Sequence, residues 1–289
     1  MPTPRRAALT IAVAALTAVT VVAQGIAPEW TQPQTPFRLF GNTYYVGTRG
    51  VAAILITSDA GHVLIDGALS ETATMIAANI RTLGFRVEDV ELIVNSHVHY
   101  DHAGGIGALQ RLSGARVAAS PSSAAVFKSG RSGPDDPQFG ILPPIETVTN
   151  VRVIADGESL RVGSLVVQGH FTGGHTPGGT SWTWRSCEAS TCLNMVYADS
   201  MTAVSADTFL FSRNKTYPQA VADFEKSFAF LRKTPCDVLL TPHPDSSSLW
   251  ARLDRRDAGE KDALADRQCP RYADRAEKQL RTRLAREAQ

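Results

Sequence analysis

Apolar positions recur along the chain with two spacings, one typical of short strands and the other typical of amphipathic helices. Short apolar runs bounded by Gly, Asn, Asp and Pro predict strands over residues 39–46, 51–57, 63–66, 90–95, 117–119, 152–155, 159–162, 165–170, 180–184, 194–198 and 238–241. Apolar positions three and four residues apart predict helices over residues 71–83, 106–112, 122–127, 217–231 and 271–288. The same order of strands and helices occurs in both halves, which favours an α/β fold. We expect an αβ/βα sandwich, in which two packed mixed β-sheets carry helices on their outer faces.

Local signals mark the ends of some of these elements. Ser70 is placed to cap the helix over residues 71–83, and Gly84 is placed to end it. Residues 129–144 break the pattern with Gly, Pro and Asp, and the sequence leaves open whether this long loop is functional or a mobile surface insertion. No internal linker divides the rest, so residues 24–289 are expected to form a single domain.

The first 23 residues have the composition of a cleaved signal peptide. Arg5 and Arg6 precede an uncharged run over residues 7–23 that ends in small side chains. A membrane anchor is the alternative, but so short a run of small residues would span a bilayer poorly. Loss of the two arginines would take the formal charge from +1 to −1. A protein with a net charge this close to zero lacks the basic surface of a nucleic-acid binder and the polybasic patch of a membrane-surface protein.

The four cysteines indicate two disulfides, because an even number in an exported chain is typical of an oxidised framework. Cys187 and Cys192 flank a short polar tip between two predicted strands, where a bridge fits a hairpin. Cys236 would then pair with Cys269. A cysteine-based zinc site is the alternative, but no two cysteines are separated by only two residues.

The strongest chemical signal follows the strand predicted over residues 90–95. His97, His99, Asp101 and His102 form the pattern H-x-H-x-D-H. Side chains of these types would repel one another when charged and would need polar partners when buried. A divalent cation removes both difficulties, so the pattern predicts a metal site.

Two later histidines complete the candidate ligand set. His175 lies in a glycine-rich segment over residues 173–179, and His243 stands between two prolines after the last predicted strand. Five histidines and one aspartate suffice for two cations and leave open positions on both, as catalysis requires. Nitrogen and oxygen ligands without thiolate favour zinc, with iron or manganese as alternatives. Of the other histidines, His62 is expected in an exposed turn, and His170 in a packing or supporting role.

Together these residues resemble the metallo-β-lactamase superfamily and, within it, subclass B3. The resemblance runs from about residue 37 to the C-terminus, and it rests on residues 41–47, 97–102, 173–184, 197–200 and 240–244. It implies the metallo-β-lactamase fold with two Zn²⁺ ions. His97, His99 and His175 would hold the first ion, and Asp101, His102 and His243 the second. The pair Cys236 and Cys269 is also similar to that subclass.

The implied activity is hydrolysis of the amide bond of β-lactam antibiotics (penicillins, cephalosporins and carbapenems), which would confer resistance to them. A zinc-bound hydroxide would attack the lactam, and Asp101 would orient it as the catalytic residue. In this subclass a Ser stands where other metallo-β-lactamase subclasses have a Cys ligand, and Ser200 fits this position; Ser200 and Thr202 would contact the substrate carboxylate, directly or through water. The implied location is the periplasm, and the partner is a small molecule rather than nucleic acid or membrane.

The sequence allows two roles for each of several further residues. Asp199 lies near a position where hydrolases such as glyoxalase II place a metal-bridging carboxylate, although the B3 pattern favours a supporting role. Tyr44, Tyr45, Phe139 and Ile141 are candidates for apolar contact with substrate, or equally for packing. The rival functions are a lactonase or another zinc hydrolase of the same fold and, more remotely, a non-catalytic zinc-binding protein. The sequence does not predict the oligomeric state.

Overall fold

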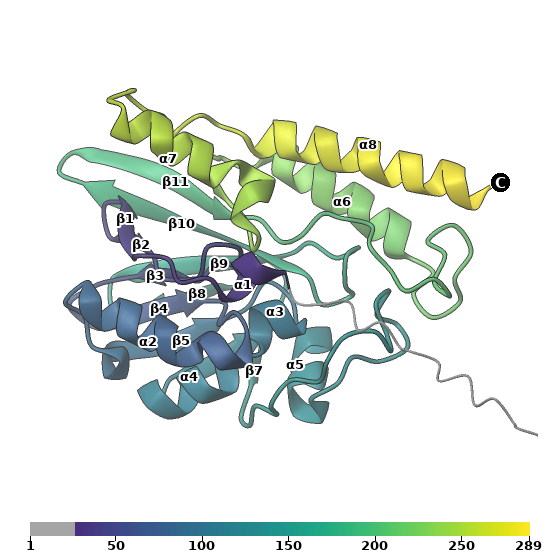
Figure 1. Ribbon diagram of the computed structural model, residues 1–289, viewed down its shortest axis with the longest axis horizontal. Helices are drawn as coiled ribbons and strands as arrows, with labels where there is room; N and C mark the ends of the chain where they lie inside the picture. Colours follow the sequence, from purple (N-terminus) through teal and green to yellow (C-terminus); the bar gives the residue numbers. More distant parts are fainter. Residues whose placement is uncertain (1–26) are drawn as a thin grey trace, which may run out of the picture.

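The structure is a computed structural model that describes residues 27–289, and it consists of two β-sheets packed face to face between two layers of helices (Figure 1). This architecture confirms the fold class expected from the strand and helix pattern. The signal peptide expected over residues 1–23 lies outside the described residues. Within residues 27–289, no helix combines the length and apolar character needed to cross a membrane.

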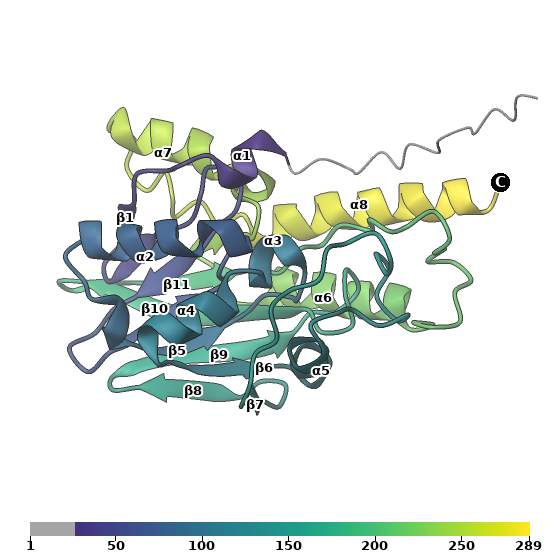
Figure 2. The same ribbon diagram turned by 60° about the horizontal axis from the view of Figure 1, so that its bottom comes forward.

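The first sheet contains seven strands whose spatial order follows their order in the chain. They are β1 (Phe37–Phe40), β2 (Thr43–Tyr45), β3 (Ile54–Ile56), β4 (His62–Ile65), β5 (Val90–Val94), β6 (Arg116–Ala119) and β7 (Arg152–Val153). Strands β1 to β4 pair antiparallel, and β4 to β7 pair parallel. Helices α2 (Ala73–Thr82), α4 (Ile106–Ser113) and α5 (Pro121–Ser129) lie over its outer face (Figure 2).

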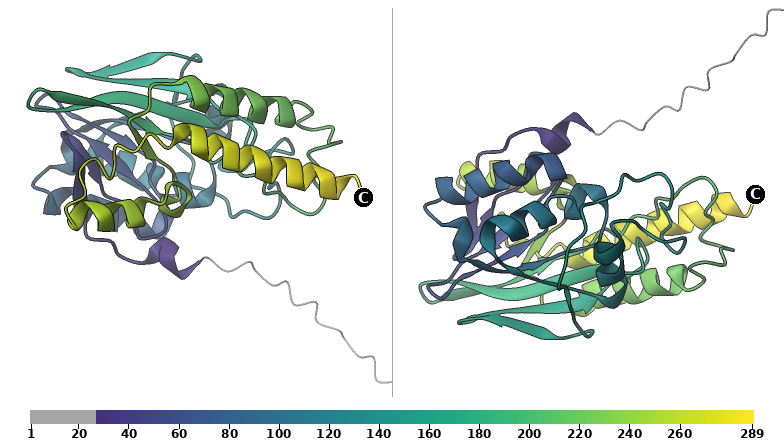
Figure 3. Two further views of the ribbon diagram at one scale, coloured as in Figure 1. Left: turned by 90° about the horizontal axis from the view of Figure 1, so that it is seen from above. Right: turned by 90° about the horizontal axis from the view of Figure 1, so that it is seen from below.

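The second sheet contains five strands. In spatial order they are β12 (Val238–Leu240), β11 (Thr191–Tyr197), β10 (Thr180–Glu188), β9 (Leu165–Phe171) and β8 (Ser159–Val162). Only the β11–β12 pair is parallel. Helices α6 (Ala220–Lys233) and α8 (Cys269–Glu287) run side by side over this sheet, and α7 (Leu249–Asp257) lies near the N-terminal end of α8 (Figure 3).

Shorter helical segments connect these elements. They are α1 (Pro28–Thr31), α3 (Tyr100–Ala103) and the 3₁₀ turns η1 (Ser70–Thr72), η2 (Val87–Asp89) and η3 (Pro244–Ser247).

The layers are held together by three apolar clusters, one between the sheets and one beneath each helical layer. Successive side chains of a strand point to opposite faces, so a central strand contributes to two clusters. In β5, Leu92 and Val94 face the second sheet, whereas Ile93 faces the helices. In β12, Leu240 faces the first sheet and Leu239 packs beneath α6 and α8. Burial on both faces explains why these strands are continuous apolar runs in the sequence.

Both predicted disulfides are present. Cys187 and Cys192 are directly paired at the tip of the β10–β11 hairpin, with their Cα atoms 4.1 Å apart. Cys236, just before β12, bonds to Cys269 at the start of α8 with a Cα–Cα distance of 6.2 Å. The second bond therefore joins the last strand of the sheet to the helix that covers it.

Several local predictions were wrong. Ser70 does not cap a helix: it begins η1, and its hydroxyl donates a hydrogen bond to the carbonyl of Gly104. The strand expected over residues 39–46 is a hairpin, because Gly41 adopts a positive φ of 51° between β1 and β2. His62 is not in an exposed turn but lies in β4, where it is 6% exposed and packs edge-on against Phe85. Helix α7 was not predicted.

Candidate metal centre

Three connecting segments bring the six candidate ligands together at one end of the sheets. The segment after β5 and the short helix α3 carry His97, His99, Asp101 and His102, the β9–β10 connection carries His175, and the residue after β12 and Pro242 is His243. Carboxyl ends of parallel strands are where open α/β sheets place functional side chains. The ligand atoms form two groups, each with its atoms within 4.8 Å of one another: His97, His99 and His175 in one, and Asp101, His102 and His243 in the other.

The connection between β9 and β10 is shaped by its glycines and held by α6. Gly174 has a φ of 124°, and a Cβ there would lie 2.4 Å from the ring of Phe224. Ser227 of α6 donates its hydroxyl to the carbonyl of Gly173 at 2.9 Å. This close approach of loop and helix fixes the backbone that presents His175.

In the first group, His97 and His175 each use Nδ1 in a short hydrogen bond and keep Nε2 for a metal. His97 Nδ1 lies 2.7 Å from Asp199 Oδ1, and His175 Nδ1 lies 2.8 Å from the carbonyl oxygen of Thr202. The remaining nitrogen, Nε2 of His97, is buried and has no hydrogen-bond partner. Burial and the nearby imidazole of His102 hold the pKa of His97 well below its ordinary value, so the ring is neutral. A neutral, buried and unpartnered imidazole nitrogen fits a metal ligand.

His99 is oriented in the opposite sense. Its Nε2 faces the carboxylate of Asp136 at 3.0 Å and 3.2 Å, which leaves Nδ1 toward the other histidines. Asp136 is only 5% exposed and belongs to the irregular segment after α5. Sequence reasoning missed this residue, because no local pattern links positions 99 and 136. The contact shows that the loop over residues 129–144 is tied to the ligand set.

The second group centres on a carboxylate. Asp101 Oδ2 lies 3.0 Å from His102 Nε2 and 3.2 Å from His243 Nε2. Burial raises the pKa of Asp101, but the imidazoles of His102 and His243 outweigh this effect. The pKa of Asp101 therefore lies well below its ordinary value. His243 directs Nδ1 to the carbonyl of Gly50 at 3.2 Å, and the ring of Trp30 lies 5.2 Å from its own. Three ligand atoms thus face one another, as they would around a cation.

A buried carboxylate supports the backbone just before the motif. Asp66, at the end of β4, accepts hydrogen bonds from the N–H and hydroxyl of Ser96 and from the hydroxyl of Tyr197, at 2.6 Å, 2.8 Å and 2.7 Å. The next residue, Gly67, donates its N–H to the carbonyl of His102 at 2.8 Å. Both ends of the H-x-H-x-D-H segment are therefore fixed by the segment that follows β4.

All six candidate ligands open onto one pocket of about 330 Å³. Its remaining lining residues are Trp30, Gln138, Leu142, Ser200, Thr202 and Val204. The structure thus brings together every predicted ligand and both predicted substrate-binding residues. Trp30, Gln138, Leu142 and Val204 were not predicted.

Comparisons with known proteins agree with this geometry. The family model described as the metallo-beta-lactamase superfamily matches residues 46–186. The solved structure of Rm3 metallo-beta-lactamase is 54% identical, with a TM-score of 0.89, and the match covers 90% of this chain and 97% of that one. The chain belongs to the metallo-beta-lactamase superfamily.

Two further solved structures indicate which subclass of the superfamily this chain resembles. MEM-A1, a subclass B3 metallo-beta-lactamase from a soil metagenome library, is 51% identical over 90% of this chain and 98% of that one, with a TM-score of 0.88. SMB-1, solved with bound 2-mercaptoethanesulfonate, is 44% identical over 89% of this chain and 99% of that one, with a TM-score of 0.86. These matches confirm the resemblance to subclass B3.

The position of Asp199 agrees with the B3 pattern rather than with a metal-bridging carboxylate. Its side chain is fully buried, and one oxygen accepts the hydrogen bond from His97. Burial raises the pKa of Asp199 to about 7. The other oxygen lies so near Gly179 that a Cβ there would be 2.3 Å away. The carboxylate therefore orients a ligand and is itself confined by a glycine.

The apolar residues proposed from the sequence for substrate contact do not line this pocket. Tyr45 is fully buried between the sheets, because its ring stacks on Phe37 in the inter-sheet cluster. Tyr44 packs edge-on against Phe85 on the opposite face of β2. Phe139 and Ile141 are 50% and 48% exposed on the loop and do not line the pocket.

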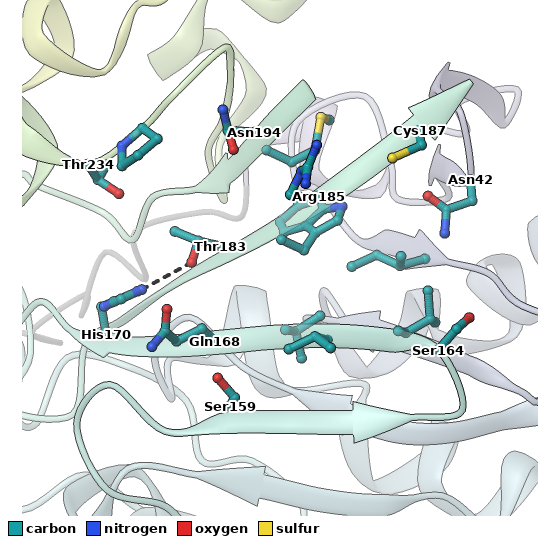
Figure 4. Close-up of a pocket in the computed structure, with 17 residues that line it drawn as sticks. Asn42, Ser159, Ser164, Gln168, His170, Thr183, Arg185, Cys187, Asn194 and Thr234 are labelled. Carbon is teal, nitrogen blue, oxygen red and sulfur yellow. Dashed lines mark hydrogen bonds between the residues drawn. The ribbon is translucent and has the colours of Figure 1, made fainter. Parts of the chain in front are cut away.

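A larger hollow of about 750 Å³ lies along β8, β9 and β10, away from the ligand groups (Figure 4). His170 is its only histidine, and no carboxylate lines it. The ring of His170 is hydrogen-bonded to the hydroxyl of Thr183 at 3.0 Å and packs on Phe230. This confirms the packing role expected for His170, and the residues described here give the hollow no metal-binding set.

Proposed function

We propose that this protein is an exported dinuclear zinc hydrolase that opens the amide bond of β-lactam antibiotics in the periplasm. The observation that carries the proposal is the convergence of two separate ligand groups, each with its free ligand atoms directed inward, on a single open pocket. Membership in the metallo-β-lactamase superfamily supports the same activity. The nitrogen and oxygen ligands, without a thiolate, favour zinc.

We assign one zinc to His97 Nε2, His99 Nδ1 and His175 Nε2. The buried Nε2 of His97 has no other partner, and the hydrogen bonds at the far side of each ring fix the tautomer required for ligation. We assign the second zinc to Asp101 Oδ2, His102 Nε2 and His243 Nε2, whose atoms already face one another.

When bound, the two zinc ions would supply a water of lowered pKa and polarise the lactam carbonyl. The second oxygen of Asp101 would accept a hydrogen bond from the attacking water and so orient it. Ser200 and Thr202 line the pocket and have hydroxyls able to donate to the substrate carboxylate. Trp30, Leu142 and Val204 supply apolar surface for the rest of the substrate. No serine nucleophile is required.

The test is hydrolysis of a carbapenem and a cephalosporin by residues 24–289, followed by the loss of lactam absorbance. His175→Ala should lower kcat/KM by more than roughly 100-fold, because removal of a ligand exceeds the effect typical of a supporting residue. Ser200→Ala should lower it by only about 10-fold, the effect of one hydrogen bond to a charged group. A Ser200→Ala enzyme that retains less than about a hundredth of the activity would contradict the assigned roles.

A parallel assay separates this activity from lactone hydrolysis. The same protein is given an N-acyl homoserine lactone under identical conditions, and both substrates are compared by kcat/KM. The proposal predicts that the lactam is preferred. Turnover of the lactone without turnover of any lactam would replace the proposal with a lactonase.

A further inference from the structure

A groove with a basic wall adjoins the metal pocket. It has a volume of about 620 Å³ and runs between helix α8 and the segment over residues 202–204. Thr202 and Val204 line both the groove and the metal pocket, so the two spaces adjoin at these residues. We refer to this space, lined from α8 by Arg275, Lys278, Gln279, Thr282, Arg283 and Arg286, as the α8 groove.

The charge along the α8 groove has one sign. No carboxylate lines it, and four of its lining residues are cationic. Arg283 is compensated by Glu287 at 2.6 Å and donates to the hydroxyl of Ser205, so it anchors the segment opposite α8. Within residues 27–289, the side chains of Lys278 and Arg286 are exposed and form no ion pair or hydrogen bond. Their charges are therefore free to act on a ligand in the groove.

Helical spacing places the cations on one face. Arg275, Lys278 and Arg286 are separated by three and eight residues, which keeps them on one side of α8. Arg275 is fixed by packing on Tyr272 and by donating to the carbonyl of Ser246. Tyr272 belongs to the stripe by which α8 packs on the sheet. The face of α8 that carries these cations therefore borders the face that packs on the sheet. This packing holds the α8 groove in a fixed position beside the metal pocket.

We propose that the α8 groove binds an anionic substituent of the substrate beyond the ring carboxylate, specifically an acidic group at C3 of a cephalosporin. This inference rests on the proposed function, in which Ser200 and Thr202 hold the ring carboxylate. In a cephalosporin that carboxylate is on C4, and C3 is the adjoining ring carbon. A C3 substituent would leave the pocket past Thr202 and Val204, where the α8 groove begins.

The expected effect is electrostatic and sensitive to salt. A cleft lined by charges of one sign raises the local concentration and the association rate of oppositely charged ligands by about 10-fold or more. Because Lys278 and Arg286 are exposed, dissolved ions would screen them. The preference for an acidic substituent should therefore be largest at low ionic strength.

The test compares two cephalosporins that share the same 7-acyl side chain. Cefotaxime has a neutral acetoxymethyl group at C3, whereas ceftriaxone has an acidic triazine there. In the zinc-loaded Lys278→Gln/Arg286→Gln variant, kcat/KM for ceftriaxone should fall about 10-fold at low salt, mainly through KM. The value for cefotaxime should change by less than about 3-fold, because its single carboxylate is held by Ser200 and Thr202.

The matched control is Arg116→Gln/Arg161→Gln, which removes the same charge from exposed residues of β6 and β8 that do not line either space. The control should leave the ratio of the two kcat/KM values unchanged. The effect of the groove variant should vanish as salt rises from about 0.01 M to about 1 M, over which the Debye length falls from about 30 Å to about 3 Å.

Four outcomes would overturn the inference: an equal loss for both cephalosporins, no loss for either, an equal effect of the control variant, or a loss for ceftriaxone that high salt leaves unchanged. A wild-type enzyme that hydrolyses both substrates while the groove variant keeps their ratio overturns the inference alone. A wild-type enzyme that binds zinc and hydrolyses neither overturns the proposed function, and the inference with it.

Discussion

Replacement of Asp136 should weaken one zinc site although Asp136 contacts no metal. Its carboxylate accepts the N–H of His99 Nε2 at 3.0 Å and 3.2 Å, and this bond keeps the ring proton on Nε2 and the lone pair on Nδ1, the atom assigned to zinc. Burial raises the pKa of Asp136, but the His99 imidazole outweighs this effect, so the pKa lies below its ordinary value. The carboxylate is therefore a charged acceptor. Asp136→Asn keeps the shape and removes the charge, whereas Asp136→Ala removes the acceptor.

The size of the effect follows from these bonds. A hydrogen bond to a charged group is worth about 1.5–3 kcal/mol, and a neutral one about 0.5–1.5 kcal/mol. Since about 1.4 kcal/mol is a factor of ten in affinity, Asp136→Asn should weaken the site by roughly 10-fold. Asp136→Ala should approach about 100-fold, the upper end of the range for residues that orient metal ligands.

The assay is competition for zinc between the metal-free protein and a chromophoric chelator, fitted to two dissociation constants. Asp135→Asn is the matched control, because Asp135 is in the same loop, is the same residue type and is exposed. Only the Asp136 variants should lose affinity, and only at one of the two sites. Wild-type affinity at both sites in Asp136→Ala would refute the role assigned to this carboxylate.

Three further predictions concern stability. Gly179→Ala should lower the free energy of unfolding in urea by about 1–3 kcal/mol, because the new Cβ would lie 2.3 Å from Asp199 Oδ2. A decrease of less than about 0.5 kcal/mol would contradict this crowding. Cys236→Ser/Cys269→Ser should lower the unfolding free energy by about 4 kcal/mol, since the bond closes a loop with a sequence separation of 33; an unchanged midpoint in denaturant would contradict it. The pKa of Glu287 is lowered, because its backbone and arginine hydrogen bonds outweigh the raising effect of burial. Its stabilising contribution is therefore present above the ordinary value of 4.5 and is lost as the pH falls through the lower folded value, so the difference in Tm between wild type and Glu287→Gln should shrink below about pH 4. An equal difference at pH 7 and pH 3 would contradict this assignment.

The features that local sequence could predict share a physical origin in short-range spacing. The strand β5 is an apolar run that ends just before His97, and the ligand pattern after it is complete within six positions. The Cys187–Cys192 bond spans a single hairpin, so its geometry is also local. His175 and His243 are distant in sequence, and it was the family resemblance that assigned them to separate zinc ions.

The residues that were missed depend on contacts between distant segments. Trp30 reaches the pocket because α1 docks on the loop at Gly50, whose N–H donates to the carbonyl of Glu29 at 2.8 Å. His62 follows a turn in the sequence, yet β4 is a central strand and buries it. In both cases the local composition is typical of an exposed segment, and the position of the side chain depends on tertiary packing.

Helix α7 shows a different limit of the pattern. Its buried face includes Leu249, Leu253 and the charged residue Arg252, which is 1% exposed. The guanidinium of Arg252 donates to the carbonyls of Leu239 and Leu264, at 2.7 Å and 2.5 Å. A buried arginine stands within the apolar stripe, and five of the nine residues of α7 are charged, so few apolar residues mark this helix in the sequence.

The most direct test of the proposed function is a zinc titration of the metal-free protein during carbapenem hydrolysis. We expect no turnover after chelation and a rise in turnover that is complete when two zinc ions are bound per chain. Direct measurement of bound zinc in the same samples establishes the occupancy. A protein that holds two zinc ions and hydrolyses no β-lactam would contradict the central claim.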